Sequence, residues 1–260
     1  MALAIACCFC LSCCASEQPK PETTTTAQTT MEEITAETTE AIKTTRAFVE
    51  HTGPYADILN AYAELERSGY KTCDKQLIGD SKLAYGVYPN SKAALYTFYD
   101  INHDGKMELL IGARVMTGNG ESYDTLLGIY ALQNDTYVSV IQEEYSRHLF
   151  LLMDKNDNPV IEDSYGHQNF SDSSFYTLDK NGGLKVLVKL YTDGCDMTNY
   201  NEETGEGVIY NRSKEMNGKL ADISEEEYLA LLRKYGSCGY STSIPESEAR
   251  QIALEWRPVS

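Results

Sequence analysis

The feature that most constrains the fold is a series of short segments in which apolar and β-branched residues alternate with polar ones. These segments follow one another along the middle of the chain and are separated by turn signals such as Gln133-Asn134-Asp135. A period of two, interrupted by Asn, Asp and Gly, predicts consecutive β-hairpins in an antiparallel meander. The expected strands span residues 94–99, 108–115, 125–132, 137–141, 148–153, 160–163, 175–178, 184–191 and 207–211.

Three helices are expected around these strands. Residues 54–68 carry apolar side chains at the spacing of an amphipathic helix, and Gly69 follows them. Ser224 and Glu227 form a capping box at the start of a second helix. Residues 245–256 repeat small and apolar residues every three or four positions and predict a third helix. The expected fold class is therefore α+β: an antiparallel β-meander, as a twisted sheet or partial barrel, with an N-terminal helix and C-terminal helices.

The chain contains 19 tyrosines, several of them in or beside the expected strands. Tyrosine favours half-buried sheet surfaces, so packing explains this enrichment. The alternative is an exposed aromatic platform for sugars or peptide. The tyrosines concerned are Tyr85, Tyr88, Tyr96, Tyr99, Tyr123, Tyr130 and Tyr137.

Residues 1–14 (MALAIACCFCLSCC) have the length and composition of a signal-peptide apolar region, and are too short to span a bilayer. Their end resembles the lipobox of bacterial lipoproteins, in which a Cys after small residues, with an aliphatic residue three positions before it, is acylated. Leu11 has this position if Cys14 is modified, although Cys13 then departs from the usual small residue. If Cys13 is modified instead, Cys10 stands where the aliphatic residue belongs. The prediction is a lipoprotein signal peptide with Cys14 or Cys13 as the lipidation site; the alternative is a secretory signal without lipid.

Residues 15–52 form a Thr- and Glu-rich segment whose first thirty residues lack aromatic side chains. Such a segment cannot bury enough apolar surface to offset the entropy of ordering it, so we expect a disordered linker. A signal peptide, a linker and one α+β domain over residues 53–260 together resemble surface lipoproteins of Gram-positive bacteria. The resemblance implies an extracytoplasmic protein held to the membrane by a lipid anchor, or a secreted one if no Cys is acylated.

Residues 100–108 (DINHDGKME) match the pattern D-x-[DN]-x-[DN]-G-x-x-[DE], in which alternate residues present oxygen ligands to calcium. The twelfth position of this pattern is Ile111 rather than Glu, and the flanking residues predict strands. The loop thus resembles calcium-binding hairpin loops of integrin-type β repeats more than an EF-hand, which implies a structural Ca²⁺. The alternative is a metal-free hairpin whose Asp and Asn side chains cap backbone amides. The expected ligands are Asp100, Asn102, Asp104, the carbonyl of Lys106, and Glu108.

Charge and motifs restrict the function. The formal net charge of -17, from 22 Lys and Arg against 39 Asp and Glu, argues against nucleic-acid binding. Zinc-protease, nucleophile-elbow and nucleotide-binding signatures are absent from the sequence. His148 and His167, near Asp163 and Ser171, form a Ser/His/Asp set on paper only. After the signal, Cys195 and Cys238 are the favoured disulfide pair beside Cys73, with three free thiols as the alternative.

The function expected from these features is a calcium-stabilised binding or interaction module without catalysis. Its partners would be the membrane, through the lipid, and a cell-wall glycan, a peptide or a protein. The alternative is an extracytoplasmic hydrolase acting on glycan or peptide, whose carboxylates the sequence does not identify.

Overall fold

The computed structural model describes residues 51–71, 74–79, 91–117, 119–143, 147–167, 170–236 and 247–260. All of them belong to one compact unit, residues 47–260. The predicted signal peptide and most of the predicted linker, including Cys13 and Cys14, lie outside the described residues.

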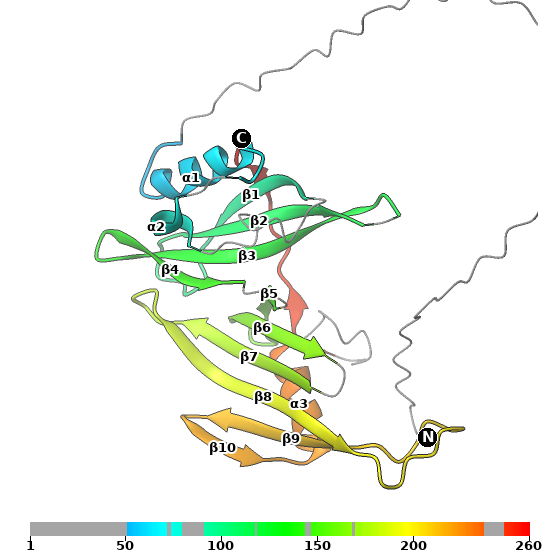
Figure 1. Ribbon diagram of the computed structural model, residues 1–260. Coiled ribbons are helices and arrows are strands. Elements are labelled where there is room, and N and C mark those ends of the chain that lie inside the picture. Colours follow the sequence, from blue (N-terminus) through cyan, green and yellow to red (C-terminus); the bar gives the residue numbers. More distant parts are fainter. Residues whose placement is uncertain are drawn as a thin grey trace, which may run out of the picture. The chain divides into compact units, whose positions relative to one another are not determined.

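A single 12-stranded sheet dominates this unit (Figure 1). Its strands run in the order β10-β9-β8-β7-β6-β5-β3-β2-β1-β12, with β4 paired to β3 and β11 to β5, and every pairing is antiparallel. The expected α+β fold with an antiparallel meander is confirmed, and each predicted strand is present. The strands are β1 (Ser91–Tyr99), β2 (Glu108–Met116), β3 (Ser122–Gln133), β4 (Thr136–Gln142), β5 (His148–Met153), β6 (Pro159–His167), β7 (Phe170–Leu178), β8 (Leu184–Asp196), β9 (Ile209–Met216), β10 (Lys219–Asp222), β11 (Arg250–Gln251) and β12 (Arg257–Pro258).

The first two helices lie where the sequence predicts them. Helix α1 (Ala56–Arg67) buries one apolar face, and helix α3 (Glu225–Tyr235) begins with the predicted cap, in which Ser224 Oγ accepts a hydrogen bond from the Glu227 amide. A short helix, α2 (Lys75–Ile78), was not predicted. In Figure 1, α1 lies beside β1 and β2, and α3 lies behind β8.

The predicted third helix is wrong for residues 247–256. This segment is extended: Arg250 and Gln251 pair with Met153 and Leu152 of β5, and farther along the chain β12 pairs with β1. The apolar spacing that predicted a helix has another cause. The segment runs from the edge of β5 to the edge of β1, and it buries Ala249 and Ile252 between them. At its two ends, the edges of β5 and β1 supply backbone partners that a helix would have supplied internally.

Three apolar clusters stabilise the sheet. The first packs α1 on β1, β2 and β3, and the third packs α3 on β5 to β8. The second joins β2, β3, β5, β6 and the C-terminal segment. The second and third clusters lie on opposite faces of the sheet, because neighbouring residues of one strand point to opposite faces. In β5, Leu151 belongs to the second cluster and Leu152 to the third; in β6, Ile161 belongs to the second and Val160 to the third. The sheet therefore has apolar packing on both of its faces at β5 and β6.

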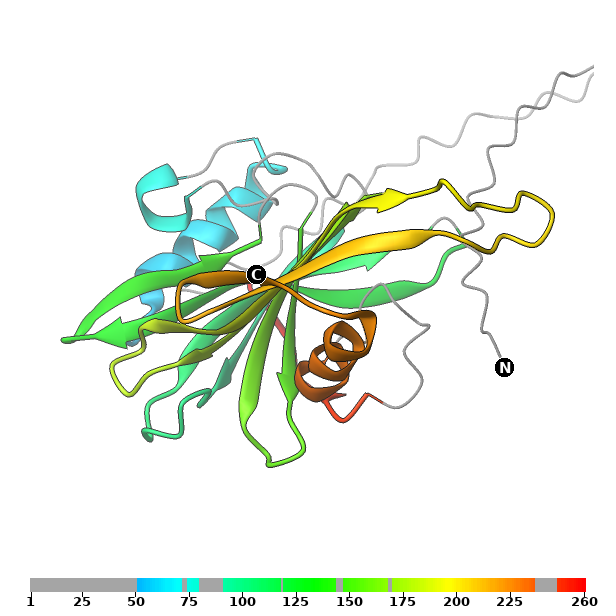
Figure 2. The ribbon, with the colours of Figure 1, turned by 90° about the horizontal axis from the view of Figure 1, so that it is seen from below.

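The sheet is strongly twisted, as Figure 2 shows when the strands are viewed from below. The hairpin formed by β8 and β9 extends well beyond the neighbouring strands. Most of the tyrosines singled out in the strands serve packing: Tyr130 is buried, whereas Tyr96, Tyr99 and Tyr137 are half-buried. Tyr123 alone among those described is exposed, and Tyr85 and Tyr88 lie outside the described residues.

Candidate functional site

The sheet splits between β3 and β5. The last residues of β3, from Gly128 to Gln133, pair with β4, and β3 meets β5 only through Leu126 and Leu149. Beyond this point the β5 edge is taken by the C-terminal segment, where the Ile252 amide donates to the Leu151 carbonyl at 3.1 Å. The first residues of β3 therefore face a gap instead of a neighbouring strand.

A pocket of about 700 Å³ occupies this gap. Ligand sites of this size are common in proteins, and they usually combine apolar walls with a few polar groups. The pocket has one wall from β3, one from β5 and one from the C-terminal segment. Its lining residues are Tyr123, Asp124, Thr125, Leu126, His148, Leu149, Phe150, Leu151, Gln251, Ile252, Ala253, Leu254 and Trp256.

Trp256, the single tryptophan of the chain, is placed by close packing on β2. A Cβ added to Gly112 would lie 2.8 Å from Trp256 Cη2 and 2.6 Å from the Thr125 carbonyl oxygen. Only a glycine fits between the ring and the neighbouring strand. Gly112 therefore fixes the depth at which the indole ring sits in the pocket.

Polar groups stand at two places on the pocket wall. At β3, Asp124 accepts two hydrogen bonds from Arg114, Nε at 2.8 Å and Nη2 at 2.9 Å. At β5, His148 Nδ1 lies 3.3 Å from Oε1 of Glu143, whose side chain is fully buried. A carboxylate in this position fixes the orientation of the imidazole ring. The side chain of His148 is itself part of the pocket wall.

The described members of the Ser/His/Asp set considered from the sequence make contacts outside that set. Asp163 accepts hydrogen bonds from Arg147, and Ser171 Oγ lies 3.3 Å from the hydroxyl of Tyr228. His148 lies beside Glu143. Of the His167 side chain the structure describes nothing.

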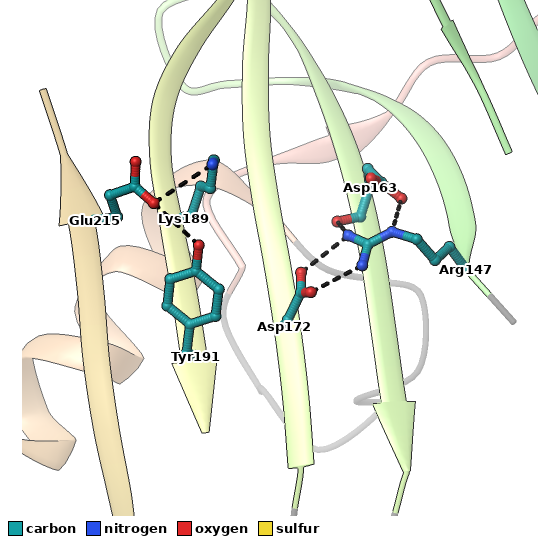
Figure 3. Close-up of polar contacts among 6 residues, drawn as sticks. All are labelled: Arg147, Asp163, Asp172, Lys189, Tyr191 and Glu215. Atoms are coloured by element: carbon teal, nitrogen blue, oxygen red, sulfur yellow. Dashed lines mark hydrogen bonds and ion pairs between the residues drawn. The ribbon is translucent and has the colours of Figure 1, made fainter. Parts of the chain in front are cut away.

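Arg147 forms a clamp next to His148, across β6 and β7 (Figure 3). Its Nε donates to Asp163 Oδ1 at 2.8 Å, and its two Nη atoms donate to the carboxylate of Asp172 at 2.8 and 2.9 Å. These hydrogen bonds raise the pKa of Arg147, so the guanidinium stays charged. The clamp anchors the start of β5 and, with it, the position of His148.

The same face of the sheet carries a second polar group on β8 and β9 (Figure 3). The hydroxyl of Tyr191 donates to Glu215 Oε2 at 3.2 Å, and Lys189 Nζ lies 3.4 Å from the same oxygen. Burial and the bond to Glu215 raise the pKa of Tyr191 to about 12. Val188 and Leu190 pack against α3, so strand alternation places Lys189 and Tyr191 on the opposite face of the sheet. The Arg147 clamp lies on that same face.

The predicted calcium loop lies between β1 and β2, and its side chains bind the loop's own backbone. Asp100 accepts from the amides of Asp104 and Gly105 at 3.1 and 3.0 Å, and Asp104 accepts from the amide of Lys106 at 2.8 Å. Asn102 Oδ1 accepts from the Asp104 amide at 3.2 Å, and its Nδ2 donates to the carbonyl of Asp179 at 2.7 Å. These are the bonds expected of the metal-free alternative.

Glu108 distinguishes this loop from an ordinary hairpin. Its side chain is 2% exposed and accepts from the Ile101 amide at 2.7 Å. Burial, followed by repulsion from Asp104 and Asp100, raises the pKa of Glu108 to about 7. A divalent cation between the three carboxylates would remove this repulsion, so the donor set fits Ca²⁺, which takes oxygen ligands.

Two other loops rich in Asp and Asn, at residues 154–158 and 179–183, have no buried carboxylate like that of Glu108. Asp154 caps the amides of Asn156 and Asn158, each at 2.8 Å, and Asp179 caps those of Asn181 and Gly183 at 2.8 and 2.9 Å. Both are Asx-type turns, in which the Asp side chain bonds to the loop's own amides. Within the described ranges, no three His, Cys, Asp or Glu side chains already stand in the geometry of a metal site.

Cys195 lies half-buried in β8 and forms no disulfide with another described cysteine. Cys73 and Cys238 lie outside the described residues.

No protein-family model matches the chain, and no similar protein was found among curated sequences or among solved structures.

The pocket between β3 and β5 was not predicted from the sequence. Its walls come from three segments far apart in the chain, so no local pattern marks it. Two single residues carried a signal in retrospect: Trp256 is the sole tryptophan, and Gly112 interrupts an apolar strand, which suggests a close approach by another group.

Proposed function

We propose that the protein is an extracytoplasmic, membrane-anchored binding module whose ligand enters the pocket between β3 and β5. The observation that carries the proposal is this pocket of about 700 Å³, with Trp256 held in its wall by Gly112 and polar groups at its rim. An aromatic ring beside fixed hydrogen-bonding groups suits ligands of mixed polarity, such as a glycan or a peptide.

The membrane anchor rests on the lipobox-like sequence that ends at Cys14 or Cys13, followed by the Thr- and Glu-rich linker. Such a linker would hold the folded unit away from the bilayer. In the part of the chain that the structure describes, no helix has the length and apolar character needed to cross a membrane.

Calcium has a structural role in this proposal. Asp100, Asn102, Asp104, the Lys106 carbonyl and Glu108 would hold the ion in the turn between β1 and β2. The ion would neutralise the repulsion around the buried Glu108 and fix the hairpin whose second strand carries Gly112. Sites of this kind in extracellular modules bind with dissociation constants of about 10⁻⁴ to 10⁻³ M.

Ligand binding is tested by the fluorescence of the single tryptophan. Residues 47–260, which contain all three apolar clusters, are titrated at several millimolar calcium with soluble cell-wall glycan fragments and, separately, with mixtures of linear peptides. We expect a saturable change in Trp256 emission with one of the two. A Tyr123→Ala variant should weaken it, and Tyr210→Ala, an exposed tyrosine on β9, should not. Unchanged emission with every ligand would contradict binding in this pocket.

The anchor and the metal are tested separately. Expression of the full chain in a Gram-positive host with a clickable fatty acid should label the protein, and replacement of both Cys13 and Cys14 by Ser should abolish the label. Calcium at a hundredfold excess over its dissociation constant should stabilise the unit by about 2.7 kcal/mol. An Asp104→Ala variant should lose this stabilisation; equal effects on both proteins would exclude the loop as the calcium site.

A second candidate function, hydrolysis of a glycan or peptide in the same pocket, is favoured by one observation: the buried carboxylate of Glu143 orients His148 at the pocket wall. A histidine held in this way can act as a general base. Hydrolysis of chromogenic glycosides or casein that disappears in His148→Ala would support this function. Equal activity of both proteins would show that the activity comes from a contaminant.

A further inference from the structure

We propose that the pocket takes an extended peptide, which pairs as an added strand with the open edge of β3 at residues 122–125. The inference rests on the proposed binding function and names the class of its ligand.

The edge of β3 is paired on one side only in this region. Ser122, Tyr123, Asp124 and Thr125 pair with Met116, Val115, Arg114 and Ala113 of β2. On their other side no strand among the described residues pairs with them, since contact with β5 begins at Leu126 and contact with β4 at Gly128. In an antiparallel strand alternate residues direct both N–H and C=O toward the same neighbour. The backbone groups that do not bond to β2 therefore face the pocket.

The opposite wall has the same character. Between Ile252, which bonds to Leu151, and Arg257, which pairs with Tyr96, the segment 253–256 has no regular secondary structure. Its backbone groups make no hydrogen bond to another described segment. The open row of β3 thus borders the pocket on one side, and a segment with unbonded backbone groups, which also lines a smaller pocket against β1, borders it on the other. Another polypeptide backbone in extended form is the ligand that satisfies such rows, as in strand addition to an exposed sheet edge.

An open edge in a folded protein is usually blocked by charge, by a bulge or by another element, because it invites pairing with other chains. This edge of β3 forms one wall of the pocket. A chain that pairs with it must therefore fit between β3 and the walls formed by β5 and the C-terminal segment. Four residues of β3 span about 13 Å at about 3.3 Å per residue, which sets the length of the paired peptide. Alternate side chains of the peptide would meet the apolar wall formed by Leu126, Ile252 and Trp256.

The probe is a displayed library of random linear ten-residue peptides, selected on residues 47–260 in calcium. We expect binders with alternating apolar residues that change Trp256 emission. The best binder is then resynthesised with a single N-methyl group at each position in turn. Pairing with β3 predicts that methylation at every second position weakens binding about tenfold or more, because each such group removes a backbone donor, whereas the positions between tolerate it. Equal tolerance at all positions would overturn the inference.

Hydrogen exchange locates the contact. Bound peptide should slow exchange of the outward-facing amides among residues 122–125 and leave the amides of β10 unchanged. Protection elsewhere would overturn the inference. If these amides are already protected in the full chain but not in residues 47–260, the groove belongs to the chain's own linker and the inference fails. Concentration-dependent protection without peptide would assign the edge to a second copy of the chain and would also refute it.

The outcomes separate the inference from the proposed function. Saturable binding of a glycan at Trp256, with no peptide selected, refutes the peptide ligand and leaves the binding module standing. Failure of both ligand classes removes the proposed function itself.

Discussion

The ionisation of Glu108 should make the folded unit less stable as the pH rises when calcium is absent. Burial and two nearby carboxylates raise the pKa of Glu108 from 4.5 to about 7. Between these values the folded state keeps a proton that the unfolded state has lost. The resulting stabilisation is fully present below pH 4.5 and is lost as the pH rises through about 7.

The size of this loss follows from the pKa. A shift of about 2.5 units, at about 1.36 kcal/mol per unit, corresponds to about 3 kcal/mol. For a unit of this length, 1 kcal/mol moves the melting temperature by about 2 to 4 °C, so the expected difference is about 6 to 12 °C. Other groups also titrate over this range, and a matched variant is needed to remove their contribution.

Glu108→Gln is that variant, because the amide oxygen can still accept the hydrogen bond from Ile101 while carrying no charge. Thermal unfolding of both proteins is followed by circular dichroism in EDTA at pH 4.5, 6 and 8. Relative to the variant, the wild type should lose about 3 kcal/mol between the lowest and highest pH. Glu226→Gln, at an exposed position of α3, provides the control and should track the wild type.

At pH 8, calcium should remove the loss of stability that the wild type shows relative to Glu108→Gln in EDTA, since the ionised carboxylate is the form that binds the ion. The wild type should gain stability with calcium and Glu108→Gln should gain much less. A difference between the two proteins that does not change with pH in EDTA would show that Glu108 titrates normally. The argument for repulsion among the loop carboxylates would then be wrong.

Three further changes test the packing. Gly112→Ala should cost about 1 to 3 kcal/mol in denaturant unfolding and shift the emission of Trp256, because the added methyl group collides with the ring and with a backbone oxygen; unchanged emission would show that the ring is not held there. Arg147→Ala should cost about 3 kcal/mol, because two partly buried carboxylates lose their partner; a variant that also replaces both carboxylates by amides should recover much of this loss. Ser224→Ala should cost about 1 kcal/mol through loss of the α3 cap, and Ser224→Asp should cost little.

The strands could be predicted from the sequence because each is a local pattern with its own turn. Residues 125–132 and 184–191, for example, carry their period of two between clear turn signals. The C-terminal segment shows the limit of this reasoning. A dozen residues with apolar groups every third or fourth position satisfy a helix, but they also satisfy an extended chain that buries Ala249 and Ile252 in different clusters. The open edges of β5 and β1 decide between the two, and no local pattern contains them.

The candidate sites divide in the same way. The loop at residues 100–108 is a continuous motif, and its place in the turn between two strands was predictable; the burial of Glu108 was not, because packing from outside the loop causes it. The pocket requires that β3 and β5 separate after a single paired position, Leu126 with Leu149, and that a segment about a hundred residues later fill part of the gap.

The two sites are connected through β1 and β2. The loop joins these strands, and Glu108 is the first residue of β2. Four residues farther along, the indole ring of Trp256 packs against Gly112. The chain after Trp256 pairs with β1. An ion that fixes the turn would therefore restrain both supports of the ring before a ligand arrives. A ligand that needs the ring in this position would lose less conformational freedom on binding when calcium is present, so calcium and ligand should each raise the affinity for the other by the same factor.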